Sequence, residues 1–128
     1  MDQTTHTAGR PAPALTDRDR LEFRNRLIGM RDRVTGEITA LRSAGATTRD
    51  SANTEEDGTD EYNREMAMEM ASAKRGTLVE IDDALARLQH GTYGLCETCQ
   101  HPIEKPRINA LPFVRTCIGC QSQIERRR

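Results

Sequence analysis

The sequence predicts a mainly α protein. A long antiparallel helical hairpin of the coiled-coil type should be followed by a small C4 zinc-finger module and a short C-terminal helix. Two stretches of helical apolar periodicity, separated by a polar segment, predict the hairpin. Four cysteines in two C-x2-C pairs predict the metal module. Only 35% of the 128 residues are hydrophobic, with two Phe, two Tyr and no Trp, which excludes a large globular core.

The N-terminal segment, residues 1–15, is polar and contains two prolines and a glycine, so we expect a disordered tail. Residues 1–20 contain no apolar run, and no segment approaches about 18 apolar residues, so we expect neither a signal peptide nor a membrane span. Thr16, followed by Asp17 and Asp19, is typical of a capped helix start with acids in its first turn. We therefore expect the hairpin to begin at residue 16.

The first helix is expected over residues 16–43. Its apolar residues recur in steps of three and four, which is the pattern of a coiled-coil seam. These seam positions are Phe23, Leu27, Met30, Val34, Ile38 and Leu41. Residues 43–58 are small and polar without a period, which predicts the turn of the hairpin.

The second helix is expected from Thr59 to Gln89, and Gly91 suits the left-handed cap after it. Its expected seam positions are Met66, Met70, Ala73, Thr77, Leu78, Ile81, Leu85 and Leu88. The short connection predicts an antiparallel hairpin over residues 16–90, with an acidic tip region at about residues 44–61.

The three methionines of this helix have a second interpretation. Met66, Met68 and Met70 would form an adaptable binding surface if they were exposed, because methionine side chains are flexible and polarizable. The helical spacing of Met66 and Met70 favours packing in the seam instead.

The strongest chemical signal comes from the four cysteines. Cys96 and Cys99 form C-E-T-C, and after seventeen intervening residues Cys117 and Cys120 form C-I-G-C. Two such pairs can close a tetrahedron of thiolates around one Zn²⁺, which leaves no open position for a substrate. We therefore predict one structural zinc ion. Two disulfides, a redox dithiol and the replacement of one thiolate by His101 are weaker alternatives, because paired C-x2-C motifs in a reducing compartment are typical of metal sites.

Residues 91–128 are expected to form the zinc module, and its last residues the C-terminal helix. Charge is unevenly distributed along the chain, although the net charge is only −1. Residues 50–61 contain six carboxylates and no Lys or Arg, whereas residues 101–128 contain six basic and two acidic residues. The nearly neutral total gives no support to nucleic-acid binding.

The cysteine motif, taken with the residues between its pairs, resembles the signature of the DksA/TraR family of bacterial transcription regulators. The order of a long helical hairpin before a C4 finger is also similar to that family, and the sequence is identified as a divergent member. The residues that carry the resemblance are Cys96, Cys99, Ile103, Arg107, Pro112, Cys117 and Cys120.

The resemblance implies a cytoplasmic regulator that binds RNA polymerase. Its hairpin would enter the secondary channel of the enzyme, and acids at the hairpin tip would modulate initiation. Asp57 and Asp60 have the acid spacing of the family's Asp-x-x-Asp-x-Ala tip, but Tyr62 stands where Ala is expected. An ungapped count from the zinc site would instead place residues 53–56 at the tip. A solvated acidic loop is the alternative for the two aspartates.

Three basic residues of the zinc module have two interpretations. Lys105, Arg107 and Arg115 would either dock on the polymerase or support the zinc–thiolate centre from outside the ligand set. The alternatives for the whole chain are a zinc-ribbon module that binds nucleic acid through these residues and the terminal arginines 126–128, and a thiol-based redox sensor. The sequence shows no nucleophile–base pair and no phosphate loop, so we expect no catalysis. We expect a monomer.

Overall fold

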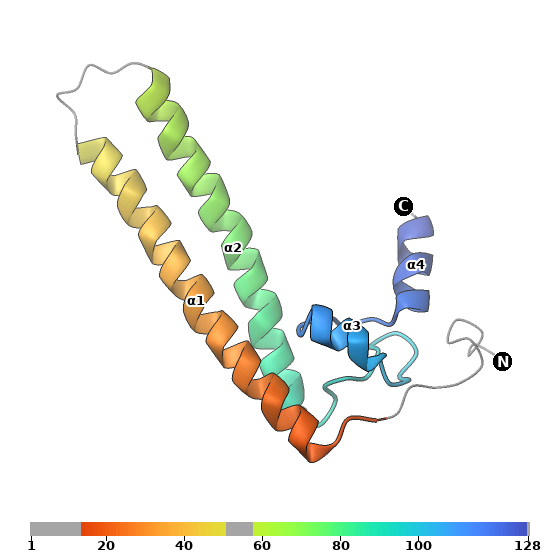
Figure 1. The fold of residues 1–128 in the computed structure, drawn as a ribbon. Coiled ribbons are helices and arrows are strands. Elements are labelled where there is room, and N and C mark those ends of the chain that lie inside the picture. The colour runs from red at the N-terminus through yellow and green to blue at the C-terminus, as the bar shows by residue number, and fades with distance from the viewer. Residues whose placement is uncertain (1–13, 51–57, 128) are drawn as a thin grey trace. The chain divides into compact units, whose positions relative to one another are not determined.

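The computed structural model describes residues 14–50 and 58–127, and in this part of the chain it is mainly helical, as predicted (Figure 1). The only β interaction here is an isolated bridge between Leu95 and Pro102. The helices are α1 (Asp17–Asp50), α2 (Gly58–His90), α3 (Lys105–Ala110) and α4 (Ile118–Arg126). None of these helices has the length and apolarity that a membrane crossing requires.

The chain divides into two compact units. The cysteine unit comprises the described residues of 1–28 and 81–128, and the hairpin unit comprises those of 29–80. Each unit contains one part of α1 and one part of α2, which form the antiparallel hairpin.

Helix α1 begins where the sequence predicted. The backbone N–H of Asp19 donates to Thr16 Oγ1 at 3.0 Å, and the N–H of Thr16 donates to Asp19 Oδ2 at 3.1 Å. This reciprocal capping box satisfies two N–H groups that a helix start leaves without partners. The predicted end was wrong, because α1 continues to Asp50 rather than stopping at residue 43. Loss of apolar periodicity does not by itself end a helix, and no proline interrupts this segment.

Helix α2 agrees with the prediction to within one residue at each end. The following Gly91 has a φ of +80°, which confirms it as the left-handed cap residue. The short C-terminal helix is also confirmed by α4. Helix α3 was not predicted; it is only six residues long and begins with a proline in its first turn.

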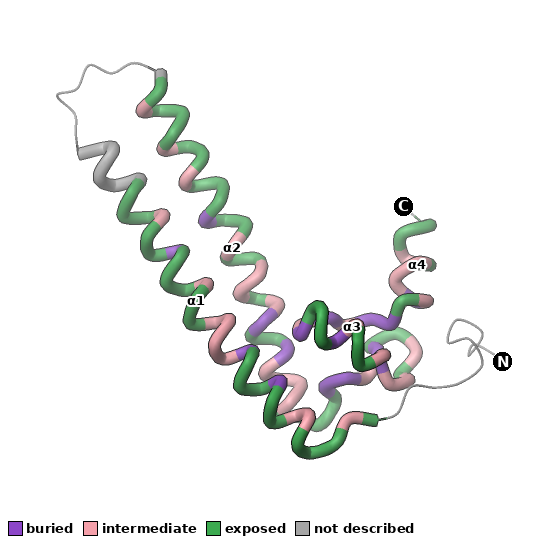
Figure 2. The backbone as a smooth tube through the Cα atoms, viewed as in Figure 1, coloured by how far each residue is buried: buried purple, intermediate pink, exposed green. Residues whose placement is uncertain are grey.

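The hairpin unit is thinly packed, and Figure 2 shows most of it as exposed. Its buried apolar side chains, among those that the structure describes, are Ile38 and Ala71. The seam prediction was wrong for Met66, Met70 and Ala73, which are exposed. Burial on α2 falls one residue later, at Ala71 rather than Met70.

The cysteine unit contains the larger core, which gathers side chains from both long helices and from the segment after α2 (Figure 2). Leu27 and Ile81 are fully buried, and the rings of Phe23 and Tyr93 meet with their centroids 6.0 Å apart. Full burial of one large apolar side chain contributes about 1.5–3 kcal/mol to the free energy of unfolding. The other buried apolar residues are Ala84, Ile103, Ile108 and Val114, together with Cys96, Cys117 and Cys120.

Candidate metal centre

The four cysteines meet in one cluster. Their Sγ atoms all lie within 4.8 Å of one another, and Cys96, Cys117 and Cys120 are buried while Cys99 is half-buried. All four are free thiols. The Sγ atoms of Cys99 and Cys117 are 4.0 Å apart, about twice the length of a disulfide bond. A tetrahedron with Zn–S distances of about 2.3 Å has edges of about 3.8 Å, so the cluster fits a zinc ion with small adjustments.

Tight turns place the first pair. The backbone N–H of Thr98 donates to Cys96 Sγ at 3.4 Å, and the N–H of Gln100 donates to the Cys96 carbonyl at 2.8 Å. Gln100 closes this turn with a φ of +63°, and its side-chain amide donates to the Glu97 carbonyl at 3.0 Å. The N–H of Cys96 donates to the His101 carbonyl at 2.9 Å. Together these bonds turn the chain so that both sulfurs face the cluster.

The second pair uses the start of α4. Cys117 is the N-cap residue, and its sulfur accepts a hydrogen bond from the backbone N–H of Cys120 at 3.4 Å. Cys120 therefore lies in the first turn of the helix, where backbone N–H groups favour negative charge. The helix start thus supplies both geometry and a favourable field for thiolates.

Electrostatics distinguish Cys96 from Cys99 and Cys120. Burial raises the pKa of Cys96, but the backbone N–H groups of Cys117, Cys99 and Thr98 outweigh it and lower the pKa to about 7. Burial raises the pKa of Cys99 and Cys120. Since the thiolate is the metal-binding form, the lowered pKa of Cys96 favours metal binding at neutral pH.

In the part of the chain that the structure describes, the metal-binding cluster consists of the four cysteines and does not include His101. Its Nδ1 atom is buried and has no hydrogen-bond partner there.

Arg107 supports the centre through the backbone. Its Nε donates to the carbonyl of Thr116 at 2.8 Å, and the Thr116 hydroxyl donates to Gln121 Oε1 at 2.8 Å. Thr116 immediately precedes Cys117, so this pair of bonds fixes the chain as it enters the second C-x2-C pair. Arg107 therefore lies beside the metal centre, where one of its two predicted roles would place it. Its contact there is with the backbone carbonyl of Thr116.

The other two basic residues contact different elements. Lys105 Nζ lies 2.8 Å from Asp19 Oδ1 at the start of α1. This hydrogen bond, together with the backbone N–H of Thr16, lowers the pKa of Asp19. Arg115 lies 3.7 Å from a carboxylate oxygen of Glu97 and 3.9 Å from one of Asp83. The chain itself thus engages Lys105, Arg107 and Arg115 at three separate places.

Three residues that sequence reasoning missed anchor the segment before Cys117. The guanidinium of Arg26 donates to the Asn109 carbonyl at 3.0 Å. The hydroxyl of Tyr93 donates to the Pro112 carbonyl at 2.7 Å. Arg87 Nη2 donates to the carbonyls of Val114 at 3.2 Å and Phe113 at 3.4 Å. Burial lowers the pKa of Arg87 and raises that of Tyr93 to about 12. No local pattern signals these donors, because each acts over 19 residues or more.

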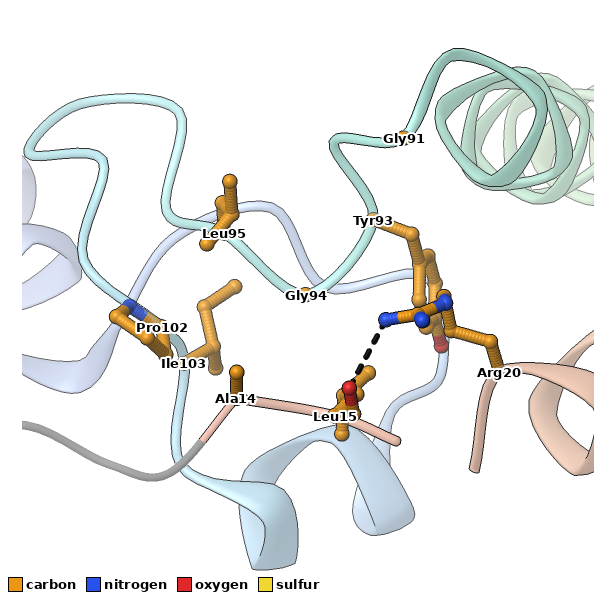
Figure 3. Close-up of a pocket in the computed structure, with 9 residues that line it drawn as sticks. All are labelled: Ala14, Leu15, Arg20, Gly91, Tyr93, Gly94, Leu95, Pro102 and Ile103. Carbon is orange, nitrogen blue, oxygen red and sulfur yellow. Dashed lines mark hydrogen bonds between the residues drawn. The ribbon is translucent and has the colours of Figure 1, made fainter. Parts of the chain in front are cut away.

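Within the cysteine unit, the segment before α1 packs against the segment after α2, beside a pocket of about 210 Å³ (Figure 3). Leu15, which the prediction assigned to the tail, lies against Gly94. The guanidinium of Arg20 donates to the carbonyl of Leu15 at 2.9 Å. A Cβ on Gly94 would come within 2.8 Å of Leu15 Cδ1, and the φ of Gly94 is +86°. Glycine is therefore required there for two separate reasons.

The predicted tip is only partly placed. Asp57 and residues 53–56 lie outside the described residues. Asp60 is half-buried in the first turn of α2, and the neighbouring Glu61 pairs with Arg64.

Comparison with known proteins agrees with this architecture. Residues 91–126 match the family model of the prokaryotic dksA/traR C4-type zinc finger. An uncharacterized protein of Aquifex aeolicus is 40% identical over 65 residues, covering 51% of this chain and 45% of that protein. The RNA polymerase-binding transcription factor DksA of Caulobacter vibrioides is 24% identical over 128 residues, covering 99% of this chain and 90% of its own. The structure of the transcription factor DksA2 from Pseudomonas aeruginosa has the same fold, with a TM-score of 0.81 over 98% of both chains at 23% identity.

Proposed function

Because the chain belongs to the DksA/TraR family of C4 zinc finger proteins, we propose that it is a non-enzymatic transcription regulator that binds RNA polymerase. The observation that carries the proposal is the alignment with a polymerase-binding factor over nearly the whole length of both chains. The hairpin, followed by a cluster of four cysteines, supports it. Such a role belongs in the cytoplasm.

In this proposal one Zn²⁺ is held by Cys96, Cys99, Cys117 and Cys120. The ion would link the two C-x2-C pairs through its four bonds to sulfur, and it is redox-inert. The chain's own contribution is to bring four sulfurs together and to hold the connecting segment by its carbonyls, as Arg107 does beside Cys117.

The hairpin is the part proposed to enter the secondary channel of the polymerase. Helices of 34 and 33 residues are each about 50 Å long at about 1.5 Å per residue, which suits a probe for a deep pore. Asp57 and Asp60 would then act on the catalytic region through their charge.

Direct nucleic-acid binding is the weaker alternative. Three of the residues that it needs, Lys105, Arg107 and Arg115, are already engaged by carboxylates or carbonyls of the chain.

The test is binding of the zinc-loaded protein to bacterial core RNA polymerase, with a Gre-type secondary-channel factor as competitor. We expect saturable binding that the competitor displaces. An Asp57→Asn/Asp60→Asn variant should still bind but lose its effect on transcription initiation. Binding that the competitor leaves unchanged would refute the channel, and absence of binding at micromolar concentration would refute the function.

A further inference from the structure

Helix α2 leaves an apolar stripe open in the hairpin unit. Tyr62, Met66 and Met70 are 59%, 40% and 47% exposed, respectively. They are spaced four residues apart, so they lie along one face of the helix, and we call them the methionine stripe. The seam with α1 uses another face, whose buried member is Ala71. The stripe is therefore not required for packing the hairpin.

Carboxylates border the stripe. Glu65 and Glu69 each follow a stripe residue by three positions, which places them beside it on the helix surface. Both are exposed, and neither forms an ion pair with any other residue that the structure describes. Unpaired carboxylates one turn apart give this edge a negative potential.

The nearest described basic residues do not neutralise that edge. Lys74 follows Met70 by four positions, and its Nζ is 3.0 Å from Glu37 Oε1. Arg64 is paired with Glu61. The surroundings of the stripe therefore carry an excess of negative charge.

From this combination we propose that the methionine stripe docks an amphipathic α-helix of a partner protein, with Lys or Arg beside the apolar residues of that helix. The stripe spans about 12 Å, which corresponds to apolar anchors over two turns of a docked helix. Methionines adapt their shape to differing apolar side chains, while the two carboxylates select for a basic edge.

A second copy of the chain fits this face poorly. Antiparallel pairing of two α2 helices through the stripe would bring Glu65 and Glu69 of one copy towards the same residues of the other. Like charges at that distance destabilise the pair. Charge complementarity therefore favours a basic helix over self-association.

This inference goes beyond polymerase binding and does not depend on it, because its test contains no polymerase. The sequence has five methionines, so the methyl spectrum of the zinc-loaded protein labelled at methionine methyl groups can be assigned by single substitutions. The probe is a synthetic peptide of leucine and lysine at helical spacing. We expect it to shift the signals of Met66 and Met70 and to leave that of Met68 in place. Equal shifts of all three, or none, would overturn the proposal.

The chain offers a matched control for the affinity measurement. Met68 is 58% exposed on the same helix but belongs to a different face. Met66→Ser/Met70→Ser should weaken peptide binding at least tenfold, equivalent to about 1.4 kcal/mol, whereas Met68→Ser should leave it unchanged. Both variants should keep the helical circular dichroism of the parent.

Charge and self-association supply the remaining outcomes. Glu65→Gln/Glu69→Gln should weaken binding and flatten its dependence on salt. A peptide with glutamate in place of lysine should not bind. Shifts of the Met66 and Met70 signals with protein concentration alone would assign the face to a second copy and so refute the partner proposed here.

Discussion

The cysteine unit and the hairpin unit share the same two long helices but are held together differently. In the cysteine unit, large side chains such as Leu27 and Ile81 are fully buried, and side-chain donors bind backbone carbonyls across long stretches of sequence. In the hairpin unit, the described buried apolar side chains are only Ile38 and Ala71. Continuous helices therefore need not be uniformly stable, and we expect the hairpin unit to open at lower free energy.

Breaking the metal site should have the largest effect and should be confined to one unit. We expect Cys117→Ser to lose the metal and to lower the free energy of unfolding of the cysteine unit by more than about 3 kcal/mol, because metal binding in such modules is folding energy. Zinc content and hydrogen exchange measure this. Thr98→Ser, in the exposed turn between the first two cysteines, is the control. Full zinc content with unchanged exchange would contradict the prediction.

Gly94→Ala should have the next largest effect. We expect a loss of about 3 kcal/mol, since a left-handed alanine costs about 1–2 kcal/mol and its Cβ would also displace Leu15. Gly91→Ala is the matched control, because its φ is +80° but nothing lies within 4 Å of its Cβ, so only about 1–2 kcal/mol should be lost. Denaturant unfolding of both variants gives the difference. Equal losses would show that Leu15 does not constrain Gly94.

Overfilling the seam tests whether the hairpin unit is tightly packed at all. Ala71 is 2% exposed, and Ala71→Leu should cost about 2 kcal/mol by forcing α1 and α2 apart. Ala73→Leu, at an exposed position of the same helix, should change stability by no more than about 0.5 kcal/mol. Hydrogen exchange should localise the first effect to the hairpin unit. If both variants lose the same small amount of stability, the seam between α1 and α2 is loosely packed, and the hairpin unit is even less tightly packed than the cysteine unit.

The smallest effect is expected at Tyr93. Tyr93→Phe removes the hydrogen bond to the Pro112 carbonyl and should cost about 1 kcal/mol at neutral pH. Burial raises the pKa of Tyr93 from 10.0 to about 12, so the folded state holds this proton more tightly than the unfolded state. The stabilisation is therefore complete below pH 10 and is lost as the pH rises towards 12. The unfolding free energies of the parent and the variant should therefore draw together as the pH rises above 10 and cross before pH 12, and a constant difference would exclude this origin.

Local patterns in the sequence predicted much of this molecule. The start of α1, both ends of α2 and the gathering of four cysteines follow from caps and spacings that act over a few residues. The seam was predicted correctly at Ile81 but wrongly at Met66, because hydrophobicity and helical spacing favoured the methionine face, whereas the fold buries the neighbouring face of Ala71. The carbonyl anchors, such as Arg26 to Asn109, could not be predicted, since their donors and acceptors are brought together only by the fold.

Four side-chain donors of the cysteine unit bind main-chain oxygens of one short segment, from Asn109 to Thr116. A carbonyl is the same for every amino acid, so these bonds place no demand on the identity of the accepting residue. They do demand a guanidinium at Arg26, Arg87 and Arg107 and a phenol at Tyr93. Substitution of an exposed accepting residue such as Asn109 should therefore leave these bonds in place, whereas substitution of a donor should remove one.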